Sequence, residues 1–123
     1  MTAIVVFLVL SVKFLLPSGY SGDLSRIGKG DPVVVLIRDK NTVQSLQLLE
    51  VMDDVRDKYG ARVEFLVVDW NTEDGRKFMK TYQAQRATIV MLDGGGEFAK
   101  NIFAPQTAET MQQEIAATFG VTP

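Results

Sequence analysis

A buried strand that runs directly into a long amphipathic helix is the feature that most constrains this chain. Residues 33–37 form an apolar, mostly β-branched run with polar neighbours, which predicts a buried strand. Thr42 then stands where a helix N-cap belongs, and Gly60 where a left-handed C-terminal cap belongs. Between them, four residues recur at the spacing of one helix face: Leu48, Met52, Val55 and Tyr59. Such a strand–helix pair is half of a βαβ unit.

The remainder of the chain supplies the other elements of an α/β sheet. Strands are predicted over residues 63–69, 89–92 and 97–103, the last as an antiparallel edge strand after a turn at residues 93–96. A helix over about residues 72–82 is predicted to bury Phe78, Met79 and Tyr82. Gly75 is expected to weaken that helix by up to ~1 kcal/mol relative to alanine. A final helix begins after Thr107 and ends at Gly120, with this buried stripe: Ala108, Met111, Ile115 and Phe119.

This order of elements resembles the thioredoxin family over roughly residues 31–119. The resemblance implies a mixed central sheet with helices on both faces. It places the family's reactive Cys-x-x-Cys motif on four residues of this chain: Thr42, Val43, Gln44 and Ser45. The chain contains no cysteine. The sequence is therefore identified as a thioredoxin-like domain without thiol–disulfide chemistry, and no catalytic residue is predicted.

Two further positions depart from the family pattern. Ala87 replaces the cis-proline that faces the active site in thioredoxins, and Leu36 replaces the buried acid that assists the cysteines. A cis bond without proline costs ~2.5–4 kcal/mol, so a trans peptide is predicted before Ala87. All three losses fit a fold retained without its redox reaction.

A partner-binding surface is predicted around these positions. The resemblance places residues 38–41 (Arg38, Asp39, Lys40 and Asn41) just before the lost cysteines, and Arg86 and Thr88 on either side of Ala87. The alternatives are a solvated charged loop at residues 38–40 and a surface salt bridge between Arg86 and Asp39 or another acid.

Thr42 and Ser45 also have two interpretations. They could be hydroxyls that stabilise the thiolate of a bound glutathione, as in transferases that share this fold. The plainer interpretation is that Thr42 caps the helix and Ser45 lies in its first turn, since no histidine is present to act as a base.

Composition excludes several classes of site. Without cysteine or histidine the chain has no thiolate or imidazole ligands, and Asp69 with Asp74 is better explained by helix capping than by metal binding. The net charge of −2 lacks a basic stripe, so nucleic acid is not an expected partner. No metal and no cofactor are expected, and the expected partner is another protein.

The N-terminal segment is the second informative stretch. Residues 3–16 are apolar apart from Ser11 and Lys13. This apolar run is shorter than the ~20 residues that a membrane span needs. The segment predicts a signal or anchor over residues 1–19 ahead of a domain at 20–123, or a first strand at residues 10–16. Membrane association through residues 1–16 or export is therefore expected, with a cytoplasmic-facing domain as an open alternative.

The predicted function is a non-catalytic protein-binding, adaptor or assembly module. Two alternatives stay open: a glutathione-binding transferase-like enzyme that uses Thr42 or Ser45, and a soluble scaffold subunit.

Overall fold

The computed structural model describes residues 19–123, which form a four-stranded sheet with three α-helices. The strands are β1 (Val33–Arg38), β2 (Glu64–Asp69), β3 (Thr88–Leu92) and β4 (Phe98–Ile102). The helices are α2 (Val43–Val55), α3 (Glu73–Tyr82) and α4 (Ala108–Phe119). Short 3-10 turns occur at Leu24–Arg26, Arg56–Lys58 and Gly60–Arg62. The predicted elements are confirmed in type and order, although β4 is one residue shorter at each end than predicted.

The sheet is mixed, with the strand order β2-β1-β3-β4. β1 pairs in parallel with β2 and antiparallel with β3, and β3 pairs antiparallel with β4. Because β1 has a strand on each side, its first five residues have no exposed surface. The continuous apolar run in the sequence reflects this central position.

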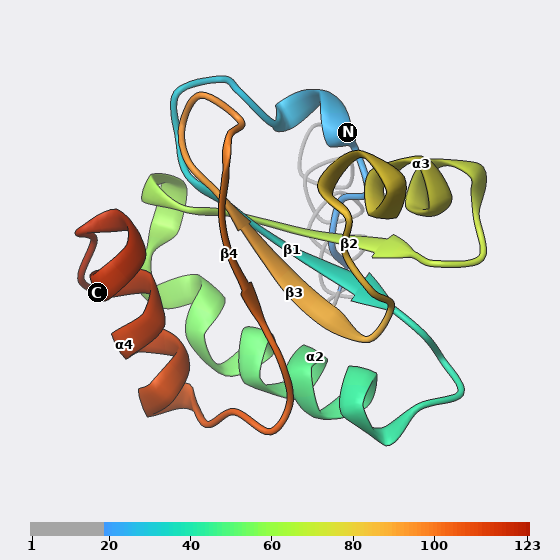
Figure 1. Ribbon diagram of the computed structural model, residues 1–123. Coiled ribbons are helices and arrows are strands. Elements are labelled where there is room, and N and C mark those ends of the chain that lie inside the picture. Colours follow the sequence, from blue (N-terminus) through green and yellow to red (C-terminus); the bar gives the residue numbers. More distant parts are fainter. Residues whose placement is uncertain (1–18) are drawn as a thin grey trace, which may run out of the picture.

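Alternate residues of β1 point into two separate cores. Val34 and Leu36 join the core that includes α2 and α4, whereas Val33, Val35 and Ile37 join the core beneath α3. Figure 1 shows α2 and α4 together on one side of the sheet and α3 on the other. Helices therefore cover both faces, as the sequence predicts.

Side-chain caps begin each helix. The hydroxyl oxygens of Thr42, Thr72 and Thr107 each accept a backbone N–H from the third residue on, which starts α2, α3 and α4. Gly120 ends α4 with a φ of 70°. Gly60 also has a positive φ, 58°, but it follows a 3-10 turn instead of ending α2, which stops at Val55.

The chain enters the sheet beside β2. Ser21 forms a single parallel bridge with Leu66, and the 3-10 turn at Leu24–Arg26 follows it. The Tyr20 hydroxyl donates a 2.6 Å hydrogen bond to Asp53 of α2, and the guanidinium of Arg56 lies 4.2 Å from the Tyr20 ring centroid. Burial and the bond to Asp53 raise the pKa of Tyr20 well above its usual value. The first strand predicted at residues 10–16 lies outside the described residues, as does the predicted signal or anchor at 1–19 apart from its last residue.

Gly75 is required by packing in the first turn of α3. A Cβ at this position would lie 1.9 Å from the backbone oxygen of Asp69, which is itself fixed by hydrogen bonds from the amide and hydroxyl of Thr72. The expectation from helix propensity is therefore wrong here, because alanine cannot fit without moving the backbone.

We predict that Gly75→Ala lowers the free energy of unfolding by about 1–3 kcal/mol, the usual cost of overpacking. Urea denaturation measures this loss. Gly95→Ala is the matched control, because its Cβ would lie 3.4 Å from the Asp93 carboxylate and the expected change stays within about 0.5 kcal/mol. A Gly75→Ala variant as stable as the native chain would contradict the packing explanation.

Candidate functional site

Asp39 organises the loop between β1 and α2. Its carboxylate Oδ1 accepts the amide N–H of Asn41 at 3.0 Å. Its backbone oxygen accepts both the amide and the hydroxyl of Thr42, at 3.1 Å and 3.0 Å. Asp39 is only 3% exposed, so the loop closes around a buried carboxylate, while Lys40 and Asn41 remain exposed as in the solvated-loop interpretation.

Thr42 and Ser45 have structural roles. The Thr42 hydroxyl oxygen accepts the amide N–H of Ser45 at 3.2 Å, which confirms the predicted cap. The Ser45 hydroxyl oxygen accepts the amide N–H of Asp39 at 2.9 Å, and Ser45 is 1% exposed. Both hydroxyls are thus committed to the start of α2, and Ser45 is not open to a ligand. The geometry gives no support to glutathione binding through these groups.

Arg86 joins the Asp39 loop to the loop before β3. Its Nε lies 3.5 Å from Oδ2 of Asp39, which confirms the ion pair considered from the sequence. The guanidinium also stacks 4.5 Å from the ring centroid of Trp70. The charge of Arg86 and the amide of Asn41 together compensate for burial of the Asp39 carboxylate.

Ala87 closes the loop onto the sheet. The peptide bond before it is trans, as predicted, and Ala104–Pro105 is the one cis bond within residues 19–123. The Ala87 amide donates to the backbone oxygen of Ile37 at 2.7 Å, so it extends the pairing of β1 with β3. This geometry holds Ala87 at a φ of 60°, in the left-handed region.

Thr88 lies inside the structure and not on the predicted surface. Its hydroxyl donates to the backbone oxygen of Gln85 at 2.7 Å and accepts the side-chain amide of Asn101 at 3.1 Å, and the residue is 3% exposed. A partner could reach Arg86 and Lys40, but it could not touch Thr88 without rearranging the loop.

Exposed apolar side chains gather where α2 begins. Val43 is 79% exposed and Leu46 is 55% exposed, and both line a hollow of about 260 Å³ together with Leu49 and the loop residues 38–42. Gln44 is also exposed. We call the side chains of Arg38, Lys40, Val43 and Leu46 the helix-start surface.

Phe103 lies on a segment that is bound to the first half of α2. The Gln47 side chain makes two hydrogen bonds with the backbone of Gln106, one of them from the Gln106 amide at 3.0 Å. Phe103 is 55% exposed. Sequence reasoning missed Leu46 and Phe103, although Val43 and Leu46 stand three residues apart and off the buried helix face, which is a detectable signal.

Residues 19–123 contain no group of three or more side chains that could hold a metal ion. Within the same residues, no helix is both long and apolar enough to cross a membrane.

Solved structures of other proteins share this fold. No family model and no curated protein sequence matches the chain. An uncharacterised thioredoxin-like protein from Clostridium perfringens is 12% identical with a TM-score of 0.72, and the match covers 87% of each chain. Thioredoxin O2 from Arabidopsis thaliana is 12% identical with a TM-score of 0.62, covering 77% of this chain and 81% of that one. Desulfothioredoxin from Desulfovibrio vulgaris Hildenborough is 19% identical with a TM-score of 0.60, covering 71% and 81%.

The chain has a thioredoxin-like fold. Because it contains no cysteine, this thioredoxin-like chain has no thiol–disulfide redox activity. In the alignment given by the sequence resemblance, Thr42 and Ser45 occupy the two cysteine positions.

We predict that Ala87→Gly raises the free energy of unfolding by about 1 kcal/mol, because glycine adopts a positive φ without the steric cost that alanine bears. Thermal denaturation should show a melting temperature higher by roughly 4 °C. The same change at Ala116, inside α4, should instead destabilise by about 0.5–1 kcal/mol. Equal effects at the two positions would contradict strain at Ala87.

Proposed function

We propose that this chain is a non-catalytic thioredoxin-like module that binds another protein through the helix-start surface. The observation that supports this proposal is a division of roles at the start of α2. Thr42 and Ser45 are consumed by capping and loop hydrogen bonds, whereas Val43 and Leu46 stand exposed next to them. Clustered apolar side chains with a polar rim are typical of protein-binding sites.

The rigidity of the loop favours binding. Asp39, Thr42 and Ser45 are linked by hydrogen bonds, and Arg86 connects this loop to the β3 side. A surface already held in one conformation loses less conformational entropy when a partner binds. Fully burying one large apolar side chain contributes roughly 1.5–3 kcal/mol, so Val43 and Leu46 together can anchor a specific contact.

The edge strand β4 is a less suitable contact. Its pairing with β3 is irregular between Met91 and Leu92, and Lys100 of β4 forms an ion pair with Glu114. Irregular edges that carry lysine are devices that discourage strand addition. We therefore place the contact at the helix start.

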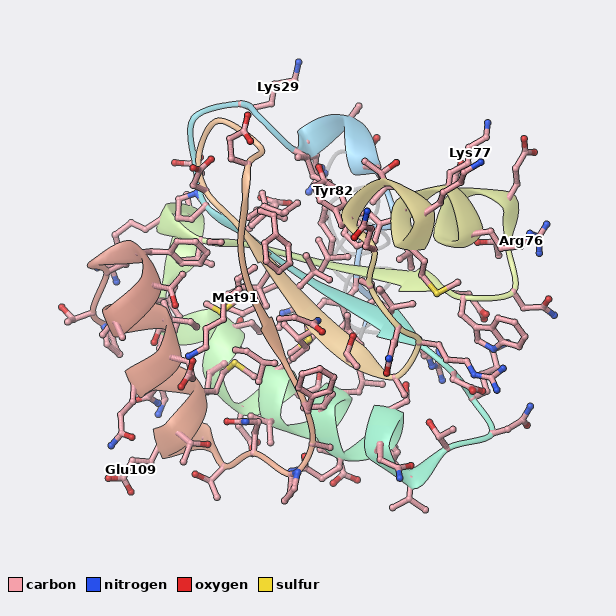
Figure 2. All side chains as sticks on the ribbon, in the orientation of Figure 1. Lys29, Arg76, Lys77, Tyr82, Met91 and Glu109 are labelled. Atoms are coloured by element: carbon pink, nitrogen blue, oxygen red, sulfur yellow. The ribbon has the colours of Figure 1, made fainter. Side chains whose placement is uncertain are left out.

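Photo-crosslinking tests the proposed contact. A benzoyl-phenylalanine at Leu46 of the full-length chain, expressed in its native cells, should give one discrete adduct that Val43→Ser weakens. The same label at Lys77 is the control, since Figure 2 shows Lys77 on α3 pointing away from the sheet. No adduct at Leu46, or identical adducts from both positions, would reject the contact.

We further propose that residues 3–16 tether the module to a membrane or direct its export. The support is the apolar run in the sequence, together with the fixed entry of the chain at Tyr20, which is bound to Asp53. An adaptor or assembly role at a membrane follows from a tether joined to a binding module.

Carbonate extraction of native membranes with intact-mass analysis tests the tether. We expect either full-length protein in the pellet, which indicates an anchor, or a soluble product that begins near Tyr20, which indicates a cleaved signal. Soluble full-length protein would overturn the membrane proposal and favour the soluble scaffold.

A further inference from the structure

Arg38 is a partly buried cation for which the described part of the chain provides no partner. It ends β1, and neither an ion pair nor a side-chain hydrogen bond to it occurs within residues 19–123. The remaining residues, 1–18, contain no aspartate or glutamate that could pair with it. Within the described residues no side-chain nitrogen of Arg38 is both fully buried and unpaired, so its unused donors are open to a ligand.

The other cations of the described residues are in different situations. Arg26, Arg56, Lys77, Arg86, Lys40 and Lys100 all take part in ion pairs. Arg62 donates to three backbone oxygens. Those left without either interaction are in the exposed class, where water can hydrate the charge: Lys29, Lys58, Arg76 and Lys80. Within residues 19–123, Arg38 alone combines partial burial with the absence of a partner.

The two acids that flank Arg38 in the fold are already engaged: Asp39 follows it in the chain, and Asp69 lies opposite it in the pairing of β1 with β2. Asp39 pairs with Arg86, and Asp69 lies 3.9 Å from the Lys40 amine. Arg38 and Leu49 line both the hollow at the start of α2 and a second hollow of about 360 Å³ that reaches Tyr20. Arg38 therefore lies between two recesses, with the exposed Leu46 on the rim of the first.

Charge around this position favours an acidic partner. Lys13 is the one charged residue among the first eighteen, so the described residues carry twelve basic and fifteen acidic side chains. Residues 38–41 instead carry two basic side chains and one acidic side chain. Arg38 and Lys40 precede the positive N-terminal end of the α2 dipole. The helix-start surface is thus electropositive within an acidic domain.

We propose that the helix-start surface binds an extended, acidic–aliphatic segment of a partner protein. A carboxylate side chain of that segment pairs with Arg38, and neighbouring aliphatic side chains cover Val43 and Leu46. This inference rests on the proposed function and specifies the partner's chemistry. Charge-assisted pairs of arginine with carboxylate are stronger than neutral hydrogen bonds, so the acid supplies specificity and the aliphatic contacts supply area.

A peptide panel tests this assignment. The peptides are eight residues long, acetylated and amidated, with Leu, Val or Ile around a central Glu, Gln or Lys. Fluorescence anisotropy with the full chain should show Glu peptides binding about tenfold more tightly than their Gln counterparts. Arg38→Met should abolish that preference, whereas Arg76→Met, a control on α3 that Figure 2 shows far from α2, should retain it.

Two further measurements keep the test decisive. Arg38→Glu should reverse the preference toward Lys peptides. The native chain in about 1 M NaCl, where the screening length is about 3 Å, should lose the Glu preference without any mutation. A preference that persists in Arg38→Met, or an absence of binding to every Glu peptide, overturns the inference. If Leu46 crosslinks to a partner while no Glu preference exists, the proposed function stands and the acidic assignment falls.

Discussion

Backbone pairing on both sides of β1 determines where every other element lies. The strand is parallel to β2 and antiparallel to β3, and its first five residues have no exposed surface. Val34 and Leu36 pack toward α2 and α4, while Val35 packs toward α3. A shift in register by one residue would exchange these two sets of side chains. The end of β1 is therefore fixed, and Arg38 is fixed with it.

The loop that follows β1 is also held in place, by contacts of Asp39. Asp39 connects three segments, because it bonds to Thr42 at the start of α2, to Asn41 within the loop and to Arg86 before β3. Burying a carboxylate is costly unless charge and hydrogen bonds compensate for it. Here Asn41 and Arg86, which lie in two different loops, together compensate for burial of the Asp39 carboxylate. The same contacts join the two loops.

Most of the fold could be predicted from local sequence patterns, whereas contacts between segments that are distant in the sequence could not. The spacing of Leu48, Met52 and Val55 is sufficient to predict α2, because helix periodicity is a local property. The stacking of Arg86 on Trp70 depends on how two loops meet in space, and one sequence does not specify that meeting. The prediction that Thr88 lies on the partner-binding surface is wrong for the same reason, since its buried hydroxyl is bonded to Asn101 of the neighbouring strand.

At the positions that the sequence resemblance aligns with the thioredoxin active site, the polar groups form hydrogen bonds within the domain. Ser45 accepts the Asp39 amide, and a hydroxyl oxygen is a better acceptor for that purpose than a thiol sulfur. The Ala87 amide is likewise consumed by Ile37. Because these groups are bonded internally, a partner would have to contact the side chains around them. The groups available for such a contact are the exposed Val43 and Leu46 and the Arg38 side chain, which has no ion pair within residues 19–123.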